Sequence, residues 1–301
     1  MTIFSQGEID KNLFDYLNFF GLKEPPFSLT PDPEYFFPTS NHLKVIEVFK
    51  YGFLKKESFM ILTGEPGLGK TLLLKLILKN LGIEYEKLFL LTPTLSPYEL
   101  ITTIAQKLNL IEDEKALSKE ILLNRLQNYL ENLRKERRIL LIIIDEAQNL
   151  PFETLEELRL LSNFETEKEK LIQFLLAGQP LLKEKLKNPM LYQLSQRITI
   201  WENLTSFNKD EVEDYVKFRL AKAGYPAIQF EKGFGKLLYK FTEGIPRLIN
   251  KLMERTLLVA FSERSQKIRK RHLKLARNSF PNEIFQTKPK KKMLRFFIKL
   301  K

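Results

Sequence analysis

The sequence predicts an α/β protein, in which a parallel β-sheet flanked by helices is followed by a small all-helical domain. Three observations support this fold class. A short apolar run at residues 58–63 leads into a glycine-rich loop and then into a largely apolar helical segment. A continuous aliphatic run at residues 139–144 ends in two acidic residues. After Leu204 the strand patterns cease and helical patterns continue.

The composition describes a globular chain and excludes several kinds of site. Hydrophobic residues make up 44% of the 301 residues and charged residues 29%, values typical of folded rather than disordered proteins. There is no cysteine, and His42 and His272 are the two histidines, so we expect neither disulfides nor a thiolate or histidine metal cluster. No aliphatic run approaches the ~20 residues of a transmembrane helix, and residues 1–12 lack a signal-peptide pattern. We expect a cytoplasmic protein, with peripheral association at the inner membrane as an alternative.

The positive charge is concentrated at the C-terminal end. The whole chain carries a net charge of +12. From Arg264 onward, 14 Lys and Arg stand against one acid, Glu283, so this segment alone carries +13. Residues 288–301 join a lysine cluster to apolar residues. This tail is expected to contact nucleic-acid phosphates or an anionic membrane surface, or to be a solvated end.

Residues 1–45 are expected to form an arm. They are dense in Phe, Tyr and Pro. The prolines force extended or turn conformations, and the aromatic rings must be buried against another surface. We expect the arm to pack across the domain that follows it, residues 46–205. Two roles stay open: the arm lies beside an adenine ring, or its aromatic residues serve packing alone.

Residues 64–71 fit the phosphate-binding pattern G-x-x-x-x-G-K-[ST]. The glycines let the backbone curve so that successive N–H groups point at a phosphate, and the following helix directs the positive end of its dipole at the same anion. Lys70 is expected to reach the β- and γ-phosphates of ATP, and the Thr71 hydroxyl is expected to bind Mg²⁺. The expected nucleotide-binding residues are Gly64, Glu65, Pro66, Gly67, Leu68, Gly69, Lys70, Thr71 and Leu72.

Strands and helices alternate in the next segment. Residues 88–92 predict a second strand. Ser96 and Glu99 have the spacing of a capping box around Pro97, which predicts a helix that runs to about residue 108. Residues 118–138 predict an amphipathic helix. This alternation implies a parallel sheet covered on both faces.

The aliphatic run at 139–144 predicts a central strand that ends at the active site. Ligands bind at the carboxyl ends of such strands, where the two acids lie. Asp145 is expected to hold Mg²⁺, directly or through water, and Glu146 is expected to act as general base on the attacking water. A strand that ends in two solvated acids is the alternative.

Two polar residues near strand ends are further candidates for catalysis. Residues 171–177 predict a buried strand followed by Gln179, which is expected to orient the attacking water as a first sensor. A plain turn is the alternative there. Arg197 precedes a strand predicted at 198–201. It is expected to act as an arginine finger on a neighbouring subunit's nucleotide, or to form a surface salt bridge.

Residues 206–280 predict a helical lid domain, with residues 281–301 as the basic tail. Asn208 and Glu211 form a capping pattern, and the helices are predicted near 209–223, 231–241, 246–262 and 267–279. Arg247 stands in the first turn of the third helix, where a positive charge opposes the helix dipole. It is therefore expected to face an anion, as a second sensor that touches the phosphates.

Together these features resemble a P-loop NTPase of the AAA+ class, and more narrowly the ExeA family of general secretion pathway ATPases. Similar families are the MshM pilus-biogenesis type and the TniB/TnsC transposition regulators. The resemblance covers roughly residues 14–280. It rests on Phe-Gly-Leu at 20–22, Pro-Phe at 26–27, Pro-Asp-Pro at 31–33, His42, Asp-Glu-Ala-Gln at 145–148, Gly-Gln-Pro at 178–180, Gln-Arg at 196–197 and Gly-Ile-Pro-Arg at 244–247.

The resemblance implies ATP binding and hydrolysis with Mg²⁺ and a nucleotide-dependent homo-oligomer, either a ring or a filament. In the secretion branch, the ATP cycle would drive assembly or remodelling of a secretion or pilus component. Members of that branch typically continue into a transmembrane helix and a peptidoglycan-binding domain, which this sequence lacks, so the basic tail is the expected attachment device. In the transposition branch, the protein would be an ATP-dependent DNA-binding regulator that recruits a transposase. Both alternatives stay open.

Overall fold

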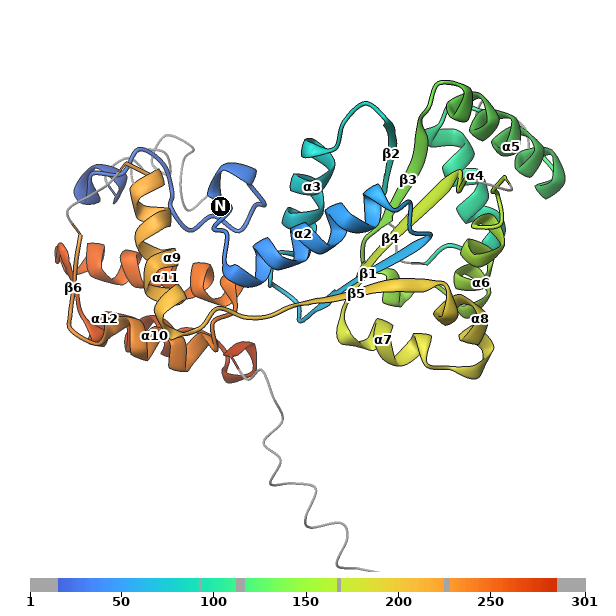
Figure 1. The fold of residues 1–301 in the computed structure, drawn as a ribbon. Coiled ribbons are helices and arrows are strands. Elements are labelled where there is room, and N and C mark those ends of the chain that lie inside the picture. Colours follow the sequence, from blue (N-terminus) through green and yellow to red (C-terminus); the bar gives the residue numbers. More distant parts are fainter. Residues whose placement is uncertain (1–15, 92–93, 112–116, 167–168, 225–227, 286–301) are drawn as a thin grey trace, which may run out of the picture. The chain divides into compact units, whose positions relative to one another are not determined.

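The computed structural model describes residues 16–91, 94–111, 117–166, 169–224 and 228–285 (Figure 1). These residues divide into two compact units. One comprises residues 38–205, and the other comprises the described residues of 1–37 and of 206–301. Each unit has its own cluster of buried hydrophobic side chains. We call them the α/β unit and the helical unit.

The α/β unit is built on a five-stranded sheet with the strand order β2-β3-β4-β1-β5. The strands are β1 (Phe59–Gly64), β2 (Tyr85–Leu90), β3 (Ile139–Ile144), β4 (Ile172–Gly178) and β5 (Ile198–Leu204). Every neighbouring pair is parallel. The loops that follow β1, β3 and β4 therefore leave from the same edge of the sheet.

Central and edge strands differ in their burial. The three central strands β3, β4 and β1 are buried at every residue, so the sequence predicted them well as aliphatic runs. The edge strands alternate between buried and exposed residues. For this reason two predicted strands are wrong in extent: the one at 88–92 begins earlier, at Tyr85, and the one at 198–201 continues to Leu204.

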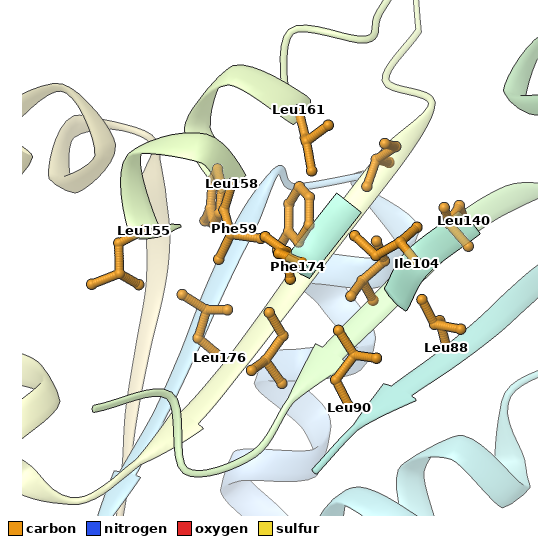
Figure 2. Close-up of a cluster of buried hydrophobic side chains, with 14 of the residues drawn as sticks. Phe59, Leu88, Leu90, Ile104, Leu140, Leu155, Leu158, Leu161, Phe174 and Leu176 are labelled. Atoms are coloured by element: carbon orange, nitrogen blue, oxygen red, sulfur yellow. The ribbon is translucent and has the colours of Figure 1, made fainter. Parts of the chain in front are cut away.

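Helices cover both faces of this sheet (Figure 1). On one face, side chains from α4 to α8 join alternate residues of the strands in a single cluster, in which the rings of Phe59 and Phe174 stack with centroids 5.0 Å apart (Figure 2). On the other face, Gln173 Nε2 donates to the carbonyl of Gly52 in α2 at 3.2 Å. The helices are α2 (Ser40–Leu54), α3 (Lys70–Asn80), α4 (Pro97–Lys107), α5 (Lys119–Lys135), α6 (Phe152–Leu161), α7 (Pro180–Leu186) and α8 (Tyr192–Gln196).

Helix α4 has the predicted N-terminus. Ser96 accepts from the Glu99 backbone N–H, and the Glu99 side chain accepts from the Ser96 N–H, so the capping box is confirmed. Helices α6, α7 and α8 were not predicted from the sequence. Helix α7 begins at Pro180, in the first helical position that proline favours, so its signal was present in the sequence.

The helical unit contains the four predicted helices, α9 (Lys209–Lys222), α10 (Phe234–Thr242), α11 (Pro246–Ser262) and α12 (Lys270–Asn278). The capping box of α9 is formed as expected by Asn208 and Glu211. The unit also contains a two-stranded parallel ladder, β6 (Gln229–Phe230) with β7 (Lys267–Ile268), which the prediction of an all-helical domain omitted. These strands have two residues each, too few to show a strand pattern in the sequence.

The described residues 16–37 of the predicted arm belong to the helical unit, whereas residues 38–45 belong to the α/β unit, in which α2 begins at Ser40. Tyr16, Phe20 and Phe27 lie in the same buried cluster as the side chains of α9 to α11. Arg219 of α9 is buried, donates to the carbonyl of Pro26, and places its guanidinium 4.5 Å from the ring centroid of Tyr35. For residues 16–37 the expectation of packing across the following domain is therefore wrong, because their apolar side chains complete the core of the helical unit instead.

Some expectations concern parts of the chain that lie outside the described residues. The basic tail at 288–301 is one of them. Within the described residues, no helix has the length and apolar character needed to cross a membrane.

Candidate nucleotide-binding site

The predicted phosphate-binding loop connects β1 to α3 at the carboxyl edge of the sheet. Gly67 and Gly69 have φ angles of 85° and 91°, in the left-handed region that favours glycine. At Gly64 the constraint is space, because a Cβ there would lie 3.1 Å from the carbonyl oxygen of Leu204. The buried side chain of Leu68 anchors the loop. The loop conformation therefore requires the glycines that the pattern supplies.

Lys70 is folded back along this loop. Its Nζ donates to the carbonyls of Gly64 at 2.8 Å and Glu65 at 3.2 Å, and its side chain is buried. Burial lowers the pKa of Lys70, while neighbouring carboxylates, Glu146 first among them, act in the opposite direction. The ammonium group is thus placed between the loop and the acidic residues at the end of β3.

The two predicted metal ligands meet across two elements. Thr71, in the first turn of α3, donates its hydroxyl to Asp145 Oδ2 at the end of β3. Asp145 is buried, and its Oδ1 accepts the backbone N–H of Glu146 at 2.9 Å. A hydroxyl and a carboxylate are oxygen donors suited to Mg²⁺. The structure therefore brings together the residues predicted to hold this ion.

Glu146 has a left-handed backbone conformation, with φ of 53°. Such a conformation is uncommon for a residue with a side chain, and it is often found at functional sites. The Glu146 carboxylate accepts hydrogen bonds from Gln148 Nε2 at 2.6 Å and from Gln179 Nε2 at 3.4 Å. Gln179 follows β4, so the predicted first sensor reaches the predicted base.

Gln148 is a member of the site to which the sequence analysis gave no role. Its side chain is buried, and its Oε1 accepts the backbone N–H of Gln179 at 3.0 Å. The residue belongs to the short 3₁₀ turn η2 (Ala147–Asn149) that follows Glu146. The available signal was its place in Asp-Glu-Ala-Gln, two residues beyond the acidic pair.

Arg197 lies at the opposite edge of the sheet. It directly precedes β5, and Ile198 pairs with Phe59, the first residue of β1. Since β1 has six residues and ends at the phosphate-binding loop, about 20 Å separate Arg197 from that loop. Its Nη1 donates to Ser162 Oγ at 2.5 Å and to the Arg159 carbonyl at 3.3 Å. Within one subunit, Arg197 is not part of the site.

Arg247 is exposed in the first turn of α11, in the helical unit. The turn before it is tightly packed, because Gly244 has a φ of 75° and a Cβ there would lie 2.0 Å from the carbonyl oxygen of Phe207. The Phe207 N–H in turn donates to the Gly244 carbonyl at 2.9 Å. The glycine thus fixes the start of α11, and the role of Arg247 as second sensor stays a prediction.

Comparison with known proteins identifies the domain that carries this site. Residues 54–186 match the family model described as an AAA domain. The chain contains an AAA domain. It is 39% identical over 254 residues to general secretion pathway protein A of Aeromonas hydrophila. The match covers 84% of this chain and 46% of the relative, so the chain spans about half the length of that protein.

Solved structures show the same fold at low sequence identity. The ORC2 protein of Aeropyrum pernix in its ADP form has a TM-score of 0.63 and 17% identity, over 88% of this chain and 74% of that chain. Cdc6p of Pyrobaculum aerophilum gives a TM-score of 0.62 at 17% identity over the same shares. A mutant RuvB protein of Thermotoga maritima gives 0.54 at 17% identity, over 84% and 74%. These similarities confirm the predicted fold, a parallel sheet flanked by helices and followed by a helical region.

Proposed function

We propose that the AAA domain binds ATP with Mg²⁺ and hydrolyses it at an interface between subunits. One observation carries this proposal: side chains from three separate elements meet at the carboxyl edge of one sheet, where hydrogen bonds link four of them and Lys70 bonds to the carbonyls of the adjoining loop. The set comprises Lys70, Thr71, Asp145, Glu146 and Gln179.

The residues at this edge fit ATP and Mg²⁺. The glycine loop and the Lys70 ammonium supply N–H donors and positive charge for phosphates, and Thr71 and Asp145 supply oxygen ligands for the ion. Bound Mg²⁺ would neutralise charge that develops on the phosphate oxygens. Glu146 would accept a proton from the attacking water, which Gln179 would orient.

Arg197 supports a site shared between subunits. Because it lies about 20 Å from the phosphate-binding loop of its own chain, we propose that it serves the nucleotide of a neighbouring subunit. An arrangement in which each subunit contributes to the next one's site is heterologous and generates a ring or a filament. The proposed assembly is therefore a homo-oligomer. Arg247 would touch the phosphates as a second sensor.

The similarity to general secretion pathway protein A favours a role of that type. We propose that the ATP cycle drives assembly or remodelling of a secretion or pilus component. The protein would work in the cytoplasm, with contact at the inner membrane, to which the basic tail would contribute.

The charge distribution favours a second candidate function, an ATP-dependent DNA-binding regulator of the transposition type. The segment from Arg264 onward carries +13, and Arg271 and Lys274 on α12 are exposed. If this function is correct, the protein will bind duplex DNA with an affinity that falls steeply as salt rises, and DNA will stimulate hydrolysis. Absence of DNA binding at low salt would exclude it.

The ATPase proposal is tested with Glu146→Gln. This variant should bind ATP and Mg²⁺ as the wild type does, hydrolyse ATP roughly 10²- to 10⁴-fold more slowly, and trap the ATP-bound oligomer. Glu131→Gln, the same change at an exposed position of α5, is the control and should keep full activity. Wild-type turnover in Glu146→Gln, or no Mg²⁺-dependent turnover in the wild type, would overturn the proposal.

A further inference from the structure

We propose that Gln148 is a positioning residue. It would hold the carboxylate of the general base, Glu146, at the tip of β4, where Gly178 ends the strand and Gln179 follows. The inference rests on the proposed function, since it gives Gln148 a part in ATP hydrolysis. Gln148 lies in η2, and 6% of its surface is exposed. A buried side-chain amide must form hydrogen bonds within the protein, and those that it forms here connect two catalytic segments.

The partners of Gln148 determine the orientation of its amide. Nε2 donates to Glu146 Oε2 at 2.6 Å, and Oε1 accepts from the backbone N–H of Gln179 at 3.0 Å. A carboxylate only accepts hydrogen bonds and a backbone N–H only donates them, so the flipped amide would lose both bonds. The side chain therefore forms a directional bridge between the base and the backbone of the first sensor.

The tip of β4 leaves space for this bridge because residue 178 is glycine. A Cβ at Gly178 would lie 2.6 Å from Gln148 Oε1 and 3.1 Å from Leu182 Cδ2. Gly178 does not have a positive φ, so its backbone conformation suits any residue. Position 178 therefore requires a residue without a side chain, because the Gln148 amide occupies the volume that a Cβ would fill.

The backbone of Gln148 is also held in place. Lys185 of α7 donates from Nζ to the Gln148 carbonyl at 3.2 Å and to the Leu150 carbonyl. Its ammonium lies 5.0 Å from the ring centroid of Phe152. Glu146, with its left-handed backbone, directly precedes η2, and Gln148 in this turn contacts the carboxylate two residues before it. The backbone that carries the Gln148 side chain is thus held in place beside Glu146.

Gln148 is the closer of the two amides that hold the base. Both amides donate to Glu146 Oε2, but Gln148 does so at 2.6 Å and Gln179 at 3.4 Å. Without the Gln148 amide, Glu146 would keep the more distant partner and lose its connection to the backbone of β4. Misplacement of a catalytic group by about 1 Å can cost on the order of 10²-fold in rate. The phosphate-binding loop, which lies between β1 and α3, would be unchanged.

The test is Gln148→Met, which keeps the length of the side chain but neither donates nor accepts in this way. We expect kcat for ATP to fall roughly 10- to 100-fold, while KM, nucleotide affinity and melting temperature stay close to wild type. Gly178→Ala should give the same pattern, because its Cβ would displace the amide. Gln127→Met, at an exposed glutamine of α5, is the matched control and should be fully active.

A second measurement separates positioning from a general structural role. If Gln148 acts through Glu146, then Gln148→Met should cause no further loss in the Glu146→Gln background, measured in single-turnover experiments. Additive losses would overturn the inference, as would wild-type kcat in Gln148→Met. If Gln148→Met does not fold, Gln148→Asn, which keeps the amide but is too short to span both partners, replaces it. A wild type that does not hydrolyse ATP would instead refute the proposed function.

Discussion

The five-stranded sheet carries polar residues at both ends of its parallel strands, but these residues are bonded in different ways at the carboxyl edge and at the amino edge. At the carboxyl edge, Lys70, Thr71, Asp145 and Glu146 are bonded to one another or to the loop between them. At the amino edge, Arg197 donates to a hydroxyl and a carbonyl, which are neutral groups. In the part of the chain that the structure describes, Arg197 forms no ion pair.

The charge of Arg197 influences its surroundings. Burial and, after it, the positive charge of Arg197 lower the pKa of Lys170. A cation that is held in place but not neutralised can accept an anionic partner from outside the subunit. One chain thus holds Lys70, Thr71, Asp145 and Glu146 at the carboxyl edge, whereas Arg197, which bonds to neutral groups, lies at the amino edge.

The largest effect is expected for Lys70→Ala, at the carboxyl edge. Loss of the ammonium should abolish detectable hydrolysis and weaken nucleotide binding, because it removes the one basic side chain that bonds to the loop among the described residues. Turnover and ATP affinity, measured by phosphate release and titration calorimetry, check this. Turnover at the wild-type rate would remove the assignment of the phosphate-binding loop.

A nearly equal loss is expected for Arg197→Ala, at the amino edge. The variant should bind ATP normally and hydrolyse it roughly 10³-fold more slowly, since an arginine finger contributes on the order of 10³- to 10⁵-fold. Arg134→Ala, at an exposed arginine of α5, is the control. Mixing Arg197→Ala subunits with Lys70→Ala subunits should restore part of the activity, because each supplies what the other lacks. No rescue would favour a role within one subunit.

A smaller effect is expected for Arg247→Ala, in the helical unit. If Arg247 touches the phosphates as a second sensor, its loss should weaken ATP affinity and slow hydrolysis by about 10-fold, the amount of one charge-assisted contact. The affinity for ADP should change less than that for ATP. Equal losses for both nucleotides would argue against contact with the γ-phosphate.

The smallest effect on catalysis is expected at His42, which is buried in the first turn of α2 and is not among the residues of either edge. Burial lowers the pKa of His42 from 6.5 to about 4. Between these values the unfolded chain binds a proton that the folded protein does not, so the free energy of unfolding should fall as the pH decreases through this window. We expect His42 to account for a loss of roughly 2 to 3 kcal/mol by pH 4.5.

Urea unfolding at pH 7 and pH 4.5 measures this loss. His42→Gln should lose less stability between the two pH values than the wild type, while its hydrolysis at neutral pH stays unchanged once it is folded. An equal loss in both proteins would show that other groups cause the pH dependence.

Much of the carboxyl edge was predictable from the sequence, since the residues concerned follow recognisable local patterns. The loop glycines, Lys70 and Thr71 are contiguous, and Asp145 and Glu146 directly follow an aliphatic run. Gln148 was not predicted because its role depends on a contact with a residue 31 positions later in the chain. The edge strands were misplaced because their outward residues are polar and interrupt the apolar pattern.

By itself the sequence determined the phosphate-binding loop, the acidic strand end and the order of most helices, because each depends on neighbouring residues and on the periodicity of buried side chains. The tertiary structure alone decided which elements meet. It placed residues 16–37 of the N-terminal arm in the helical core, put Arg197 at the edge opposite the loop, and joined Gln148 to the tip of β4. These outcomes depend on burial and on strand order, which no local pattern contains.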